Sequence, residues 1–453
     1  MSLFSSLKRE QKEAIGLLQI GTFLEYFDLM IYVHMAVLLN DLFFPKTDAH
    51  TTALLSAFAF CSTFVFRPFG ALIIGWIGDN IGRKTTVIIT TMMMALSCII
   101  MANLPTYSQI GISAAWIVTL CRIIQGFSSI GEIIGAEIYI TEITKPPKQY
   151  MLVSLVTVFS VFGTVIALSV ASLVTSFGLS WRIAFWIGAC IALIGSVART
   201  RLRETPEFVD MKRRMKKAIE ESSRDGLGKA AELLKSTNPI WGKKVNKKTT
   251  VSLFLIYCGY PVCFYFCYIY CANILKSQFA YTPEQIIHQN LLVSLLQLLT
   301  YFLVSLLSQK IHPLKILKIR SLIVLPLLLI VPYILSHATT PNSIFIIQLI
   351  SVSLVLTEVP AASVFITHLP IFKRFTYTSF AYALARAIIY VITSFGLVYL
   401  TEWFGHSGLL IIMLPICISY LYGVHHFEKL EKQFETSTNA KEAGEKLMSS
   451  PAS

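Results

Sequence analysis

Long apolar stretches follow one another along almost the whole chain, and they constrain its fold more than any other feature. A helix needs about 20 apolar residues to cross a bilayer, and twelve stretches satisfy that length. Only 14% of the 453 residues are charged, whereas a soluble domain is roughly one-quarter charged. We therefore expect an all-α membrane protein. Its expected spans are residues 15–40, 52–78, 85–103, 109–140, 150–175, 182–202, 250–274, 286–309, 314–336, 342–369, 375–400 and 405–425.

One long polar stretch, rich in lysine and arginine, separates six of these spans from the other six. Its first part, residues 207–221, fits either an amphipathic helix on the membrane surface or a solvated linker. The final residues form a short polar tail that we expect to be mobile, although residues 427–434 fit two further turns of the last helix. The expected parts are a first six-helix bundle (1–202), a basic cytoplasmic linker (203–249), a second six-helix bundle (250–426) and a cytoplasmic tail (427–453).

Basic residues alternate between the loops in a way that predicts orientation. The loops after spans 2, 4, 8 and 10 contain Arg83 and Lys84, Lys145 and Lys148, Lys310 and Lys315, and Lys373 and Arg374. The loops after spans 3, 5, 9 and 11 have almost no lysine or arginine. Because basic loops stay on the cytoplasmic side, both termini are expected there. The same rule accounts for the formal net charge of +13 without any nucleic-acid partner.

The turn between the second and third spans combines glycines with opposite charges in the pattern Gly-x-x-Gly-Asp-x-x-Gly-Arg-Lys. Its charged residues are too costly to sit in lipid and so mark a membrane surface. Its first two glycines permit close helix approach, and the third permits the positive φ that so short a turn requires. The corresponding loop of the second half keeps its basic character but has Gln309 in place of the acid. The residues of the motif are Gly75, Gly78, Asp79, Gly82, Arg83 and Lys84.

Ionisable residues within the spans are functional candidates, because they are expensive in lipid. Glu25 and Asp28 are three residues apart and so share one face of the first span. Two carboxylates this close suit a group that binds and releases a proton, while the alternative is that one of them only pairs with an arginine to hold helices together. In the fourth span a polar stripe about 15 Å long must face the bundle interior or a water-filled cavity. The residues of this stripe are Arg122, Gln125, Ser129 and Glu132, and Glu137 beyond them is interpreted as structural.

The second half places Glu358 and Arg386 in otherwise apolar spans. An arginine near the midplane needs an acidic partner or an anionic ligand. Several tyrosines of the seventh span are suited to holding a carboxylate or a cationic nitrogen, although helix packing is the simpler role for any one of them. The nine cysteines form no Cys-x-x-Cys pair or metal-ligand spacing, and no nucleophile or phosphate-loop motif occurs. We therefore expect no enzyme, no metal site and no cofactor.

Several of these segments together resemble one family of transporters. The glycine–aspartate turn resembles the loop between spans two and three of the major facilitator superfamily. The motifs Glu25-Tyr-Phe-Asp28, Arg67-Pro-Phe-Gly70, Arg122-Ile-Ile-Gln-Gly-Phe and Glu204-Thr-Pro-Glu-Phe208 look like its metabolite:proton symporter family. They fall in the expected order over residues 21–208, and the second half matches mainly in the number and spacing of its spans. The nearest likeness is to the proline/betaine branch.

The resemblance implies a twelve-helix transporter of the bacterial inner membrane that takes up small metabolites with protons. Asp79, Gly82, Arg83 and Lys84 would form a cytoplasmic latch that favours the outward-open state. Arg122 and Glu132 would line the central cavity, with Glu25 and Asp28 in the proton and substrate path. Ile130 and Arg386 depart from the family pattern, so the resemblance leaves the substrate open.

The function expected from these observations is proton-coupled import of a small zwitterionic or anionic metabolite by alternating access. The mixture of acids (Glu25, Asp28, Glu132) and cations (Arg122, Arg386) suits a zwitterion such as proline or betaine. The alternatives are a metabolite exchanger, uptake of a di- or tricarboxylate, and a membrane sensor that no longer transports. The expected partners are the small-molecule substrate, protons and the lipid bilayer, with no nucleic acid, and the protein is expected to act as a monomer.

Overall fold

The computed structural model describes residues 8–35, 39, 42–45, 61–200, 202–206, 209–210, 212–213, 216 and 245–449, and its regular structure there is helical. The first half contains α1 (Arg9–His34), α4 (Arg67–Asn80), α5 (Arg83–Asn103), α6 (Tyr107–Ile110), α7 (Ile112–Ile143), α8 (Lys148–Ser176) and α9 (Arg182–Arg199). The second half contains α12 (Lys247–Tyr257), α13 (Gly259–Phe264), the π-helical η1 (Tyr265–Tyr270), α14 (Cys271–Phe279), α15 (Pro283–Leu307), α16 (Pro313–Ser336), α17 (Pro341–Ser353), α18 (Ala362–Thr367), α19 (Ile371–Val391), the π-helical η2 (Ile392–Gly396), α20 (Leu397–Phe404), the 3₁₀ turn η3 (Gly405–Ser407) and α21 (Gly408–Ser449).

The described helices agree with an all-α membrane protein. Ten of them are long and apolar enough to cross a membrane, and two shorter apolar helices, Arg182–Val197 and Pro341–Ser353, lie where the sixth and tenth spans are expected. Helices α15, α16 and α17 each begin with a proline, whose missing N–H is one that a first helical turn leaves unpaired anyway. Large apolar side chains such as Trp116 and Trp403 are exposed on the outer faces, as a lipid environment requires.

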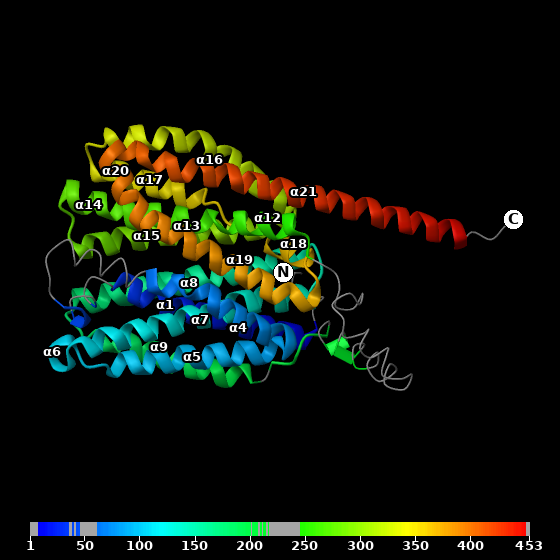
Figure 1. Ribbon diagram of the computed structural model, residues 1–453, viewed down its shortest axis with the longest axis horizontal. Coiled ribbons are helices and arrows are strands. Elements are labelled where there is room, and N and C mark those ends of the chain that lie inside the picture. Colours follow the sequence, from blue (N-terminus) through cyan, green and yellow to red (C-terminus); the bar gives the residue numbers. More distant parts are fainter. Residues whose placement is uncertain are drawn as a thin grey trace.

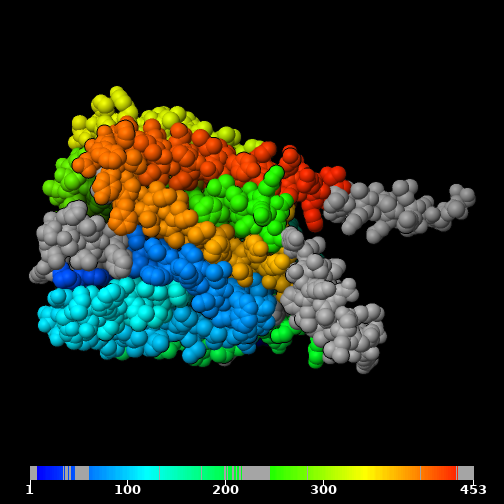
Figure 2. All heavy atoms as spheres, viewed as in Figure 1, coloured from blue at the N-terminus to red at the C-terminus, as the bar shows by residue number. Residues whose placement is uncertain are grey.

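The helices gather into two bundles, one for each half of the chain (Figure 1). The long helices α1 to α9 lie together, and α12 to α21 form the other layer. The two bundles meet where α4 packs against α19 and where α8 packs against α15. The space-filling view shows the orange second-half helices lying directly against the blue first-half helices on the face it presents (Figure 2).

The tenth span is not the continuous helix that the apolar stretch 342–369 predicts. Helix α17 ends at Ser353 and α18 begins at Ala362, so residues 354–361 pass through the bundle without helical structure. Pro360 contributes to this break, because proline has no N–H to donate and disfavours helical backbone in the residue before it. The break carries Glu358, one of the predicted site residues.

The last helix, α21, includes the two further turns that the sequence allows at residues 427–434. It then continues to Ser449, beyond the prediction, and projects beyond the bundles (Figure 1). Side chains of the second bundle hold the first part of this extension. The Glu431 carboxylate lies 3.3 Å from His368 Nε2 and 3.9 Å from His312 Nε2. Lys318 Nζ lies 2.8 Å from Glu428. A polar helix with such partners has a reason to stay ordered that the tail sequence alone does not reveal.

Several segments meet at the end of the molecule from which α21 projects. They are the α4–α5 turn, the C-terminal end of α7 and the N-terminal end of α19 (Figure 1). We call this the gate end.

Candidate functional site

At the gate end, Asp79 of the first bundle is bound to the backbone of the second. Its carboxylate accepts hydrogen bonds from the N–H groups of Phe375 (3.1 Å) and Thr376 (2.9 Å) and from the Thr376 hydroxyl (2.7 Å). The donors lie in the second turn of α19. Asp79 therefore joins α4 to α19 with three charge-assisted hydrogen bonds.

Arg83 extends this junction through a second carboxylate. Its Nη1 donates to the Gly78 carbonyl (2.5 Å), and its Nη2 donates to Glu142 (3.1 Å) and to the Ile371 carbonyl (3.0 Å). Glu142 Oε1 also accepts from Arg374 Nη1 at 3.1 Å. One buried carboxylate thus bridges an arginine of each bundle. Sequence reasoning missed Glu142, and it treated Arg374 only as an orientation signal.

The predicted motif glycines serve this close contact. A Cβ on Gly75 would lie 2.8 Å from the Cα of Thr376, and one on Gly78 would lie 2.5 Å from the Phe375 ring. Both distances are shorter than real Cβ contacts, so α4 and α19 approach this closely only because the side chains are absent. Gly82 has φ 148°, which confirms the positive φ expected of the turn.

Glu204 ties the segment after α9 to the same end. Its two carboxylate oxygens accept from the backbone N–H groups of Arg83 (3.0 Å) and Lys84 (3.2 Å), which are the first two residues of α5. This is the N-terminal capping arrangement, in which an acid satisfies N–H groups that have no partner within the helix. Thr205 donates from its hydroxyl to Glu142 Oε2 at 2.7 Å. In the second half, Gln309 contacts Met151 of the first bundle instead of supplying an acid.

The two acids of α1 line one small cavity between α1, α5 and α9. The cavity volume is about 10 Å³, which is room for roughly one water molecule. Asp28 accepts a hydrogen bond from the Cys98 thiol of α5, and a Cβ on Gly188 of α9 would lie 1.9 Å from its Oδ1. Glu25 and Asp28 therefore share a face, as predicted, and Asp28 is held inside the first bundle.

The predicted stripe of α7 also makes most of its contacts within the first bundle. Arg122 Nη1 donates to Gln125 Oε1 (2.8 Å) and to the Leu29 carbonyl (3.3 Å), and its guanidinium lies 4.2 Å from the Tyr32 ring centroid. The Ser129 hydroxyl donates to the Gly126 carbonyl of its own helix at 3.0 Å. The side chain of Glu132 lies outside the described residues. These contacts fit a structural role for Arg122 as well as a role in lining a path.

A cluster of cations and tyrosines occupies the interface between the bundles. The Arg386 guanidinium lies 3.4 Å from the Tyr382 ring centroid and 5.4 Å from that of Tyr260. The hydroxyls of Tyr382 and of Tyr26 in α1 are 3.4 Å apart. Arg67 of α4 is 1% exposed and interacts electrostatically with Arg386 and both of these tyrosines. We call Tyr26, Arg67, Tyr260, Tyr382 and Arg386 the interface cluster.

The two arginines of this cluster have spare hydrogen-bonding capacity. Among the described residues, Nε and Nη2 of Arg67 and Nη1 of Arg386 are buried and find no hydrogen-bond partner. An unpaired buried donor of this kind is costly, so the site is suited to receiving an anionic group. Arg67 belongs to a motif read from the sequence, yet only the fold shows that it reaches Arg386.

Acids approach the interface cluster from both bundles. Arg386 interacts electrostatically with Glu358 of the helix break and with Glu137 of α7. Glu25 interacts with Tyr26 and Arg67 on the other side. The interpretation of Glu137 as a structural residue missed this placement. The sequence did contain a signal for Glu137, because a charged residue within an apolar span is a functional candidate.

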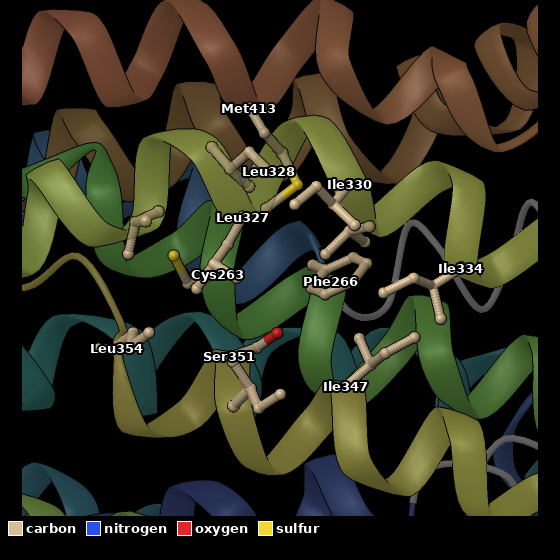
Figure 3. Close-up of a pocket in the computed structure, with 13 residues that line it drawn as sticks. Cys263, Phe266, Leu327, Leu328, Ile330, Ile334, Ile347, Ser351, Leu354 and Met413 are labelled. Atoms are coloured by element: carbon tan, nitrogen blue, oxygen red, sulfur yellow. The ribbon is translucent and has the colours of Figure 1, made fainter.

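An apolar pocket of about 80 Å³ within the second bundle has a different character (Figure 3). Its lining includes Cys263, Phe266, Leu328 and Met413, and Ser351 supplies its hydroxyl. Its wall contains exposed isoleucines on the outer face of the bundle. Such a lining offers almost no polar partner to a charged metabolite and is chemically suited to an acyl chain.

Two helical bundles locked at one end, with buried charges between them, define a polytopic membrane protein of the transporter class. The family model described as Major Facilitator Superfamily matches residues 18–397. The chain therefore belongs to the major facilitator superfamily, whose members are transporters and not enzymes.

Known proteins agree with this assignment. The chain is 31% identical over 222 residues to the proline/betaine transporter of Salmonella typhimurium, covering 48% of this chain and 44% of that protein. It is equally similar over 223 residues to the glycine betaine/proline/ectoine/pipecolic acid transporter OusA of Dickeya dadantii, again covering 48% and 44%. The matched region is less than half the length of these relatives. The proton:xylose symporter XylE has the same fold, with a TM-score of 0.72 over 92% of this chain and 95% of XylE at 14% identity.

Proposed function

We propose that this protein is a secondary active transporter that imports a small zwitterionic or anionic metabolite together with protons. The observation that carries the proposal is the interface cluster, in which two buried arginines with unpaired donors, one from each bundle, interact electrostatically among tyrosines and acids. A carboxylate placed between Arg67 and Arg386 would satisfy those donors. The kinship with proline/betaine transporters supports a zwitterion of that kind.

Within this proposal, each end of the substrate has a chemically matched partner. The substrate carboxylate is bound by Arg67 and Arg386, because guanidinium groups pair with carboxylates through two parallel hydrogen bonds. The cationic nitrogen is received by tyrosine faces such as that of Tyr260, and by the acids beyond them. An apolar metabolite would leave all these polar groups desolvated and unpaired.

Transport would proceed by rocking of the two bundles about this site. We assign the gate end to the cytoplasm, because the basic loops lie there, and both termini with it. The Asp79 and Arg83 contacts then close the cytoplasmic side, so the described state is closed at that face. We further propose that the protein lies in the bacterial inner membrane and works as a monomer. In this proposal the two bundles are the domains that move.

The test is uptake of radiolabelled proline and glycine betaine into proteoliposomes, with and without an inward proton gradient. Gradient-dependent accumulation is expected, and Arg67→Lys and Arg386→Lys should each weaken it, because a lysine cannot pair bidentately. The exposed Arg203→Lys is the matched control. Absence of uptake by folded protein, with these substrates and with di- and tricarboxylates, would contradict the proposal.

One rival is favoured by a specific observation. Two arginines facing one another also suit a dicarboxylate, and a metabolite exchanger would need no proton gradient. Counterflow that is insensitive to the gradient would identify that rival. A sensor that retains the fold without transporting would show ligand binding and neither uptake nor counterflow.

A further inference from the structure

We propose that Glu137 and Glu358, which approach Arg386 from opposite bundles, together form the site that carries the coupled proton. The inference rests on the proposed proton-coupled transport and names the groups that perform the coupling. It transfers this role from the Glu25 and Asp28 pair, which the sequence favours, to a pair that only the fold brings together.

Glu137 lies where an ionised carboxylate is hard to maintain. Its side chain is 1% exposed, and neither carboxylate oxygen has a hydrogen-bond partner among the described residues. Removing a charge from water without such partners is far more costly than removing the neutral acid. Its environment therefore favours the protonated form whenever Arg386 is engaged elsewhere.

Glu358 lies in the break of the tenth span and is also buried. It is 4% exposed and accepts a hydrogen bond from the Thr357 hydroxyl at 3.0 Å. It lies between Ser353 and Ala362, where the backbone is not helical. The Glu358 carbonyl accepts from the Ala361 N–H at 2.6 Å, and the Thr357 carbonyl accepts from the Tyr420 hydroxyl at 2.6 Å, so this break is held in a defined conformation. Broken helices of this kind supply ion and proton sites near the middle of transporters.

The charge balance around Arg386 leaves room for one proton. Arg386 interacts electrostatically with two carboxylates in the described structure, Glu137 and Glu358. Arg67 also interacts with Arg386, and Arg67 interacts in turn with Glu25. The neutral groups that also interact with these residues are Tyr26, Tyr257, Tyr301, Tyr382, Tyr390, Tyr420 and Cys258. One guanidinium balances one of the two carboxylates that share it, so the group of Arg386, Glu137 and Glu358 becomes neutral when one acid holds a proton.

This arrangement links the proton to the substrate. A substrate carboxylate that binds Arg386 competes with Glu137 and Glu358 for the same guanidinium. The site then gains by neutralising one of these acids with a proton, and by linkage the bound proton favours the anionic substrate equally. Glu137 belongs to the first bundle and Glu358 to the second, so the shared proton also relieves repulsion between the halves that move.

The experiment compares Glu137→Gln with the wild type in proteoliposomes that hold a pH dye, using proline and glycine betaine as probes. We expect Glu137→Gln to retain counterflow, to lose accumulation above the outside concentration, and to lose substrate-dependent proton entry. Glu358→Gln should behave likewise. Glu402→Gln, an exposed acid of α20, is the matched control and should accumulate as the wild type does.

Full gradient-driven accumulation by Glu137→Gln would overturn the inference. It would also be overturned if Asp28→Asn lost proton coupling while both glutamate variants kept it. If the wild type shows counterflow that ignores the proton gradient, then the proposed symport itself fails. An independent measurement uses infrared difference spectra of the detergent-purified protein between acidic and alkaline pH. The carbonyl band of a protonated carboxyl should be present in the wild type and reduced in both glutamine variants, and an unchanged band in both would refute the assignment without any substrate.

Discussion

Replacing Asp79 by asparagine should open the gate end. The carboxylate accepts three hydrogen bonds from α19, which join α4 to the second bundle. It also lies 3.5 Å from Arg83, across the α4–α5 turn. An asparagine keeps the shape, but its NH₂ group must face N–H donors, and it carries no charge. Hydrogen bonds to charged groups contribute about 1.5–3 kcal/mol each. Because the three share one acceptor, a total loss of about 3 kcal/mol is reasonable, which corresponds to roughly a 100-fold shift toward the open gate.

The shift is measurable as a distance between the bundles. Spin labels can be attached at Ile81, in the α4–α5 turn, and at Lys315, at the start of α16. Both residues are exposed, and they lie on opposite bundles at the gate end. The exposed Cys190 is first replaced by serine, since the other eight cysteines are buried. Asp79→Asn should move the distance distribution toward longer values. Asp210→Asn, an exposed acid with the same charge change, should leave it unchanged. A distribution that is identical in Asp79→Asn and the wild type would refute the argument that these bonds hold the gate closed.

Three further substitutions test other contacts. Gly78→Val should also lengthen the gate-end distance, because even a Cβ there meets the Phe375 ring, and an unchanged distance would show that α19 can give way. Gly188→Ala should lower the melting temperature measured in detergent, since the new methyl would lie 1.9 Å from Asp28 Oδ1. Adding Asp28→Asn should not restore the melting temperature, because the amide occupies the same volume as the carboxylate. Glu204→Gln should lower the protection of the first α5 amides against hydrogen exchange, by roughly the 1 kcal/mol of a lost cap, whereas Glu10→Gln, an exposed acid, should leave that protection unchanged.

The parts that the sequence predicted well are those that depend on neighbouring residues. Span length follows from local hydropathy, and the positive φ of Gly82 follows from a turn too short for any other path. The pairing of Glu142 with Arg374 joins residues 232 positions apart, and no local pattern encodes such a distance. The broken tenth span was missed because its composition is apolar, as that of a continuous span would be, although Pro360 was a local signal of the break. Glu137 was undervalued because its partners come from the other half of the chain.

The gate end and the interface cluster share the helices α7 and α19, so a movement at one of these sites can change the contacts at the other. On α7, Glu142 at the gate and Glu137 near Arg386 are five residues apart, or about 7.5 Å along the axis. On α19, Thr376 at the gate and Arg386 are ten residues apart, or about 15 Å. Packed helices move as nearly rigid rods, so rocking that separates Asp79 from Thr376 also changes how Glu137 faces Arg386. In the proposed mechanism, protonation at the interface cluster and closure of the gate are therefore two consequences of one movement of α7 against α19.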